Sequence, residues 1–87
     1  MIHDEILDRY INMVKRWDPE CDPDRPTGEW HLHWMLNEIR ARQFDNDYDG
    51  LKYHRWLGYI QGVLITKGYT TVNEERDFTR PYFTKVK

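Results

Sequence analysis

The sequence lacks most of the side chains with which enzymes attack a substrate or hold a catalytic metal. It contains no serine, and its single cysteine, Cys21, lies in an acidic segment that does not favour the thiolate form. A glycine-rich phosphate loop and a His-Glu-x-x-His motif are absent as well. We therefore predict that the protein is not an enzyme and that it needs no cofactor.

Features of secreted and membrane proteins are missing too. A single cysteine cannot form an intramolecular disulfide, which indicates a reducing compartment. No apolar run approaches the length of about 18 residues that a transmembrane helix needs. The first five residues show neither the basic nor the apolar part of a signal peptide. These absences predict a soluble, cytoplasmic protein that does not engage a membrane.

Positive charge is scarce in the first part of the chain. Residues 1–50 carry twelve acidic and six basic side chains, a balance of −6, whereas residues 51–87 carry three acidic and seven basic ones, a balance of +4. Sequence-independent binding of duplex DNA needs a clearly basic domain and is not expected. The asymmetry suits self-association or an anionic partner on the C-terminal part, or else the two parts neutralise each other within one fold.

Aromatic residues, in contrast, are abundant. The 87 residues include four Trp, six Tyr and three Phe, and a chain of this length forms one small domain with a thin core. Each aromatic side chain buries on the order of 150–250 Å². Because a small helical bundle has difficulty burying so many, we expect some of them at a subunit interface or a binding surface. We therefore predict a homo-oligomer.

Apolar residues recur at the helical period in three segments, which predicts an all-α fold. The predicted helices of this three-helix bundle cover residues 4–17, 28–44 and 50–67, and a proline-rich acidic loop covers residues 18–27. Thr27 and Asp49 are expected to cap the second and third helices, and Gly68 to end the third. A short helical turn, residues 74–79, is expected between a capping Asn73 and Pro81.

Two glycines interrupt the predicted third helix. Gly58 and Gly62 are four residues apart, and each costs a helix interior about 0.8–1 kcal/mol relative to alanine. We expect this cost to be tolerated where something approaches the backbone closely. A neighbouring helix of the same chain, a second subunit and a ligand are all candidates, and a helix is the favoured one.

The acidic segment before the third helix resembles the first half of an EF-hand loop. Its aspartates at loop positions one, three and five precede a glycine at position six, as calcium coordination requires. Position twelve, however, is Trp56 instead of a bidentate acid. The segment is therefore interpreted as an acidic turn that caps a helix, with only weak candidate metal ligands: Asp45, Asp47 and Asp49.

The histidines suggest a metal site only weakly. His31 and His33 point about 200° apart on a helix, so only one of them can meet His54 across a helix pair. Arg76 and Arg80, in contrast, share a helical face and form an anion-binding cluster if Arg55 and His54 lie nearby. The alternative is that both arginines pair with acids such as Glu74, Glu75 and Asp77.

Three segments resemble a group of small proteins encoded by tailed phages and prophages. They are His-Leu-x-Trp-Met-Leu at residues 31–36, Arg-Trp-Leu-Gly-Tyr-Ile-Gln-Gly-Val-Leu at residues 55–64, and Glu-Arg-Asp-x-Thr-Arg-Pro-x-Phe at residues 75–83. The resemblance covers roughly residues 30–83. It implies a setting rather than an activity: small phage proteins often bind host proteins stoichiometrically, defence inhibitors among them, and some sequester nucleotide signals.

Together these features predict a non-enzymatic phage accessory protein that acts by stoichiometric binding and inhibits a host or anti-phage defence protein. The first alternative is capture of a small anionic ligand such as a nucleotide signal, with the C-terminal arginines on its phosphate and Trp56 or Tyr59 stacking on its base. A small metal-dependent enzyme is a further alternative. The candidate binding residues are His33, His54, Arg55, Trp56, Tyr59, Gln61, Arg76 and Arg80, and the close-approach residues are Gly58 and Gly62.

Overall fold

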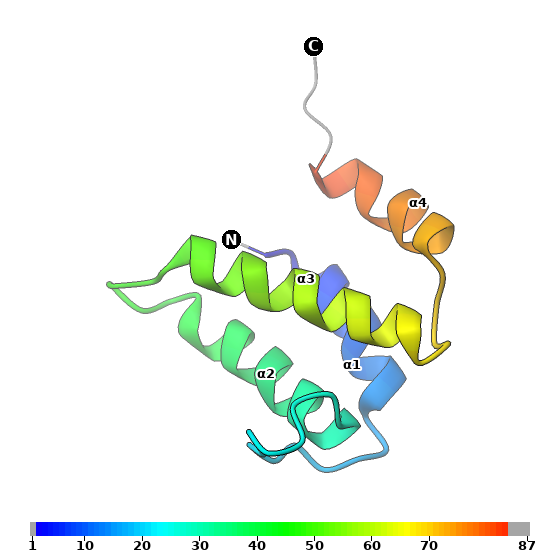
Figure 1. Ribbon diagram of the computed structural model, residues 1–87. Helices are drawn as coiled ribbons and strands as arrows, with labels where there is room; N and C mark the ends of the chain where they lie inside the picture. Colours follow the sequence, from blue (N-terminus) through cyan, green and yellow to red (C-terminus); the bar gives the residue numbers. More distant parts are fainter. Residues whose placement is uncertain (1, 84–87) are drawn as a thin grey trace.

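The computed structural model describes residues 2–83, which form four α-helices joined by loops (Figure 1). The helices are α1 (Asp4–Val14), α2 (Glu29–Arg42), α3 (Gly50–Thr66) and α4 (Val72–Phe83). The described residues contain no β-strand, so the predicted all-α class is confirmed. The fold has one more full helix than expected, because the predicted C-terminal turn is a helix of 12 residues.

The core lies among α1, α2 and α3. One face of each helix supplies it, at the three- and four-residue spacing that the sequence shows. Met13, Trp17, Trp56 and Val63 lie half-buried at the edge of the core. The buried apolar residues are Ile2, Ile6, Leu7, Tyr10, Val14, Leu32, Met35, Leu36, Ile39, Tyr53, Leu57, Ile60 and Leu64.

The first two helices differ from the prediction at their ends. Helix α1 ends at Val14 instead of residue 17, and a tighter turn follows in which the Trp17 N–H donates to the Val14 carbonyl at 3.0 Å. The N-cap of α2 is Gly28 and not Thr27. A Cβ at Gly28 would lie only 2.7 Å from the Trp30 ring, so a larger residue here would displace that ring.

Both predicted ends of α3 are confirmed. The Asp49 carboxylate accepts a hydrogen bond from the Lys52 N–H at 3.1 Å and caps the first turn. At the other end Gly68 adopts φ 88°. The Gly68 N–H bonds to the Ile65 carbonyl and the Tyr69 N–H to the Leu64 carbonyl, both at 3.0 Å, which completes a Schellman motif.

Helix α4 begins earlier and ends later than the predicted turn. Its cap is Thr71 and not Asn73: the Glu74 N–H donates to Thr71 Oγ1, and the Thr71 N–H donates to the Glu74 carboxylate, both at 3.1 Å. This reciprocal pair is a capping box. Pro81 lies inside the last turn instead of ending the helix. Only one backbone hydrogen bond is lost there, and the helix needs to continue for only two further residues.

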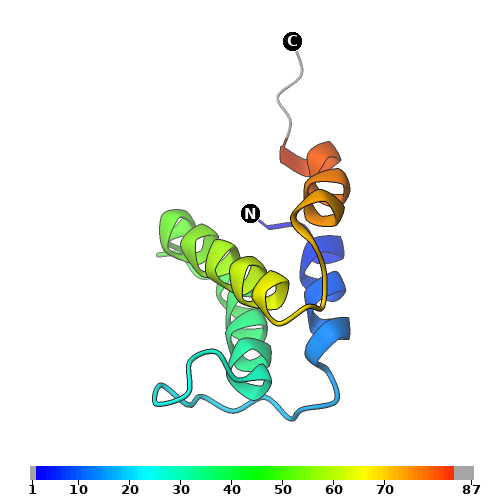
Figure 2. The ribbon, with the colours of Figure 1, turned by 45° about the vertical axis from the view of Figure 1, so that its right-hand side comes forward.

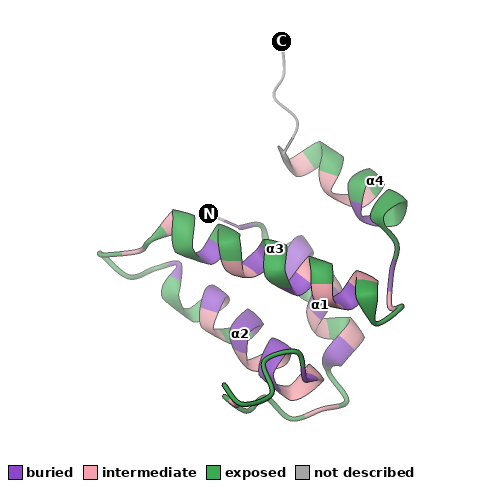
Figure 3. Cartoon of the chain, viewed as in Figure 1, coloured by how far each residue is buried: buried purple, intermediate pink, exposed green. Residues whose placement is uncertain are grey.

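The molecule is flat, with principal extents of 43 × 35 × 18 Å. Helix α4 lies beside α1 at one end of α3, away from α2 (Figure 2). Most of α4 is exposed, whereas the buried residues of the first three helices face one another (Figure 3). Within residues 2–83, no helix combines the length and the apolarity that crossing a lipid bilayer demands.

Candidate binding face

A row of aromatic rings crosses the surface that α2 and α3 share, and we call it the aromatic face. Neighbouring ring centroids are 5.1 to 5.9 Å apart, and the pairs are stacked, tilted or edge-to-face. Such geometry adds about 0.5–1.5 kcal/mol per pair beyond burial. The rings belong, in order along the row, to His31, Trp34, Trp56, Tyr53 and Tyr48.

The aromatic face is only partly buried. His31 and Tyr53 are buried, whereas Trp34, Trp56 and Tyr48 are half-buried and contribute area to the surface. Two hollows lie along the row, and both are lined by Trp34 and Trp56. A ring-lined surface is therefore left open between α2 and α3.

The loop between α1 and α2 forms a fixed wall of one hollow. The Glu20 N–H donates to the Trp30 carbonyl at 3.0 Å, and the Trp30 indole donates to the Asp22 carboxylate at 3.1 Å. Further along, the Tyr59 hydroxyl of α3 donates to the Pro26 carbonyl at 2.7 Å. These bonds tie a proline-rich loop to both helices, so the wall is in place before any ligand arrives.

This hollow, which we call the Arg55 groove, has a volume of about 530 Å³. Among residues 2–83, its only charged lining side chain is Arg55, which is exposed. At its floor His31 is 8% exposed, and its Nδ1 accepts a hydrogen bond from the Asp22 N–H at 2.9 Å. The described residues that line it are Cys21, Pro23, Pro26, His31, Trp34, Met35, Arg55, Trp56 and Tyr59.

The second hollow is polar, and both acidic and basic side chains line it. The Lys52 ammonium lies over the Tyr53 and Trp56 rings, 5.3 and 5.4 Å from their centroids. Arg42 contacts the carboxylates of Glu38 and Asp45 at 3.3 and 3.4 Å. Because these pairs are exposed, they contribute little to stability and leave the surface available for other contacts.

The weak calcium candidates do not assemble into a site. The Asp45 carboxylate pairs with Arg42, and Asp49 caps α3. Among the described residues, no group of three or more His, Cys, Asp or Glu side chains is placed to hold a metal ion. The acidic segment therefore acts as a turn with a helix cap, which was the favoured interpretation of its sequence.

The structure brings together three of the predicted binding residues: Arg55, Trp56 and Tyr59 all line the Arg55 groove. His33 and Gln61 instead make internal contacts. A His33 ring nitrogen lies 2.7 Å from the Trp17 carbonyl oxygen, and the Gln61 amide donates to the Tyr10 hydroxyl at 2.7 Å.

The predicted cluster of Arg55 with Arg76 and Arg80 is not formed. Both C-terminal arginines are exposed on α4, and neither lines the Arg55 groove. Arg80 lies 3.5 Å from the Asp77 carboxylate, as the alternative of internal pairing predicts. His54, on α3, is exposed and does not line the groove either.

The expected close approach at the two glycines is not made within residues 2–83. A Cβ built at Gly58 or Gly62 would meet nothing within 4 Å. Both positions lie on the outer side of α3, because the core-facing positions of that helix are Leu57, Ile60 and Leu64. The first candidate was a neighbouring helix of the same chain. For the described residues that expectation is wrong.

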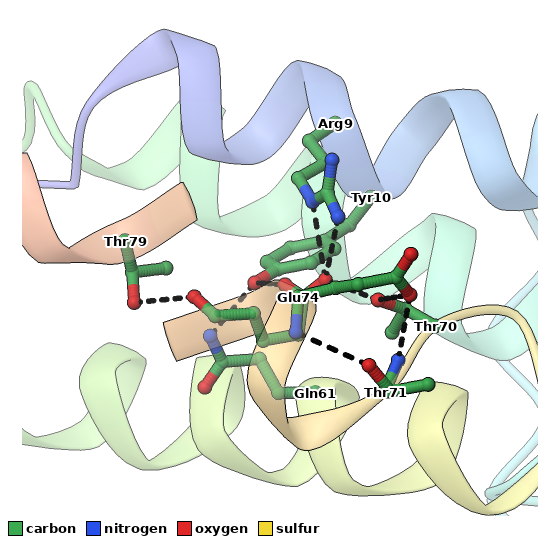
Figure 4. Close-up of polar contacts among 8 residues, drawn as sticks. Arg9, Tyr10, Gln61, Thr70, Thr71, Glu74 and Thr79 are labelled. Atoms are coloured by element: carbon green, nitrogen blue, oxygen red, sulfur yellow. Dashed lines mark hydrogen bonds and ion pairs between the residues drawn. The ribbon is translucent and has the colours of Figure 1, made fainter. Parts of the chain in front are cut away.

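A buried polar cluster joins α1, α3 and α4, and we call it the Glu75 cluster. The Arg9 guanidinium donates twice to one Glu75 oxygen, at 2.8 and 3.1 Å, and Thr70 donates to the same oxygen at 2.5 Å. The Tyr10 hydroxyl donates to the other oxygen and accepts from Gln61. Figure 4 shows Arg9, Tyr10, Gln61 and Thr70 converging on the start of α4.

Both carboxylate oxygens of Glu75 are engaged within the protein. Burial alone would raise the pKa of Glu75, but the hydrogen bonds from Arg9, Thr70 and Tyr10 outweigh it and hold that pKa below its ordinary value. Burial and the bond to Glu75 raise the pKa of the Tyr10 hydroxyl. The cluster thus keeps Glu75 ionised and Tyr10 protonated, and it fastens α4 to the core. Arg9 and Tyr10 are 66 and 65 residues from Glu75 in the sequence, so no local pattern indicated the cluster.

No protein-family model, curated protein or solved structure matches this chain. The candidate site is accordingly assessed from its own geometry.

Proposed function

We propose that the protein acts by stoichiometric binding of another protein, and that the aromatic face is the binding surface. The observation that carries this proposal is the open row of rings between α2 and α3, of which Trp34 and Trp56 are only half-buried. Trp, Tyr and Arg dominate the energetic centres of protein interfaces, and this face combines all three types. The rigid wall formed by the loop lowers the entropy lost on binding.

The partner that we propose is a host protein whose activity is inhibited by the complex. The setting comes from the resemblance of residues 30–83 to tailed-phage proteins, and the cytoplasm of the infected cell is the expected location. Capture of a small anionic ligand is the runner-up. The ligand would enter the Arg55 groove, because Arg55, Trp56 and Tyr59 lie there together and α4 does not contribute to it. A metal-dependent enzyme, the remaining alternative, has no assembled ligand set among residues 2–83.

Self-association is part of the same proposal. Gly58 and Gly62 lie on an uncovered side of α3, where a second copy has space to approach the backbone. Thr27, Tyr59, Val63 and Lys67 border this space. The glycine cost of about 0.8–1 kcal/mol per position is then offset in the oligomer and not in the single chain.

The test compares two truncations of aromatic side chains. Trp56→Ala removes the centre of the aromatic face, and the control Phe44→Ala removes a side chain that is 78% exposed elsewhere on the surface. Each protein is used to isolate partners from extracts of the infected host, and each captured partner is purified and titrated by calorimetry. We expect saturable binding with a fixed ratio of chains for the wild type and Phe44→Ala, and at least about a tenfold loss for Trp56→Ala.

Equal affinities for both variants would place the binding surface elsewhere. A wild-type protein that converts its partner chemically, or that saturates with a small anion and no protein, would contradict the proposed function itself. Circular dichroism of Trp56→Ala establishes that a loss of binding does not reflect unfolding.

A further inference from the structure

The Arg55 groove indicates which part of a partner is recognised. We infer that it receives a short segment of the partner protein in which a large apolar side chain lies next to an aspartate or glutamate. The apolar side chain occupies the groove, and its neighbouring carboxylate reaches Arg55 and the His31 ring. This inference rests on the proposed function, because it names the chemistry of the segment that the aromatic face binds.

The size and walls of the groove suit a large apolar side chain together with the residue next to it. Its volume of about 530 Å³ is in the range of small-ligand pockets, too small to take up a whole helix. Trp34 and Trp56 are in contact, with centroids 5.9 Å apart, so nothing inserts between them. The incoming side chain instead lies between these rings and the proline wall at Pro23 and Pro26.

One buried donor at the floor of the groove is left unused. Because His31 Nδ1 accepts from the Asp22 N–H, the neutral ring carries its proton on Nε2. Among the contacts of residues 2–83, Nε2 has no partner, although His31 is 8% exposed. Within residues 2–83, the side-chain atoms that are both fully buried and without a partner are Arg40 Nε and Tyr48 Oη. His31 Nε2 is not among them, so solvent can still reach it. It remains accessible from the groove that His31 lines, and an acceptor on the ligand would satisfy it.

The charge of the groove sets the charge of the ligand. Among the described residues, Arg55 is its one charged lining residue, and the exposed Arg76 and Arg80 of α4 do not line it. A single guanidinium and a single imidazole N–H match one carboxylate. A terminal phosphate of a nucleotide carries a second negative charge, for which the groove supplies no cation. The observations therefore favour a carboxylate of a peptide over a nucleotide.

The experiment uses the four tryptophan indoles as reporters. Indole N–H resonances of ¹⁵N-labelled protein are assigned with single Trp→Phe variants. The unlabelled probes are acetyl-Phe-Asp-amide, its neutral counterpart acetyl-Phe-Asn-amide, and AMP. Trp34 and Trp56 line the groove and report binding there, whereas Trp17 lies outside it and serves as an internal reference.

We expect the aspartyl peptide to shift the Trp34 and Trp56 resonances, with a dissociation constant in the millimolar range. The neutral peptide should bind about three- to tenfold more weakly, as the loss of one charge-assisted contact requires. Arg55→Gln should abolish this difference, and the matched substitution Arg76→Gln on α4 should leave it intact. Both arginines are exposed, so neither change is expected to unfold the protein.

Three results would overturn the inference: equal affinity for the two peptides, tighter binding of AMP than of the aspartyl peptide, or no shift of Trp34 and Trp56 at about 10 mM probe. Its failure is distinguishable from failure of the proposed function. If Trp56→Ala abolishes binding of the captured partner while Arg55→Gln does not, the aromatic face binds a protein and the carboxylate assignment alone is wrong.

Discussion

The aromatic face and the Glu75 cluster both gather aromatic and charged side chains, but one is open and the other is closed. In the Glu75 cluster each carboxylate oxygen is bonded within the chain, and the Glu75 side chain is 6% exposed. On the aromatic face Trp34, Trp56 and Tyr48 are only half-buried. Within residues 2–83, the Arg55 guanidinium and His31 Nε2, which line the Arg55 groove, have no protein partner. Satisfied polar groups stabilise a fold, whereas unsatisfied ones beside an apolar hollow are available to a ligand.

This difference predicts that the two regions respond oppositely to mutation. The largest effect is expected for Glu75→Ala, which leaves Arg9 and Tyr10 without their shared acceptor. Removing one member of a buried ion pair costs about 3–5 kcal/mol. Urea denaturation should show this decrease in the free energy of unfolding, and the folded fraction should still bind its partner. A loss below about 1 kcal/mol would show that the cluster does not fasten α4.

Trp56→Ala should produce the converse pattern. Because Trp56 is half-buried, its removal should lower the free energy of unfolding by less than Glu75→Ala does. Its effect on partner affinity should be larger, about 2–4 kcal/mol for a residue at the centre of an interface. Calorimetric titration and denaturation of the same preparation provide both numbers. A variant that loses stability and keeps its affinity would identify Trp56 as a core residue only.

A pH titration isolates the ionised state of Glu75. Its pKa is lowered in the folded protein, so the ionised carboxylate stabilises the fold above the unfolded pKa of about 4.3. That contribution is lost as the pH falls through the lower, folded pKa. Thermal midpoints of the wild type should therefore decrease more steeply on acidification than those of Glu75→Gln. Parallel curves would mean that other carboxylates account for the acid sensitivity.

The glycines give the smallest expected effects and test the outer side of α3. If a second copy covers this side, as proposed, the methyl groups of Gly58→Ala and Gly62→Ala should obstruct it and weaken the oligomer. In a monomer each substitution should instead raise the free energy of unfolding by about 0.5–1 kcal/mol, because the added methyl group meets open space. The control Gly68→Ala should lower it by about 1–2 kcal/mol, since φ at Gly68 is 88°. Light scattering reports the oligomer. A variant that is stabilised and whose mass by light scattering equals that of the wild type would contradict the proposed self-association.

Local patterns predicted the helices well, because amphipathic spacing and caps act within a few residues. Asp49 and Gly68 were identified in this way. Thr71 and Glu74 have the three-residue spacing of a capping box, so the sequence contains this signal for the start of α4. Asn73 was nevertheless predicted as the cap. Pro81 was expected to end the helix, and its late position in α4 explains why it does not.

The sequence predicted much less well which side chains come together in the folded protein. Arg55, Trp56 and Tyr59 were predicted binding residues and do lie together, because all three are on one helix. His31 and the proline wall were missed, since their contribution depends on how the loop folds back onto α2. The expected packing of a helix of the same chain against Gly58 and Gly62 is wrong for the described residues, because sequence alone does not show which side of a helix is left uncovered.

The central claim is that the aromatic face, and not the Glu75 cluster or α4, is where a partner binds. The most direct measurement is the set of indole N–H resonances of the labelled protein as the purified partner is added. The account predicts that the Trp34 and Trp56 signals shift or broaden until a fixed ratio of chains is reached, while the Trp17 signal changes least. Unchanged Trp34 and Trp56 signals in a saturated complex would contradict it.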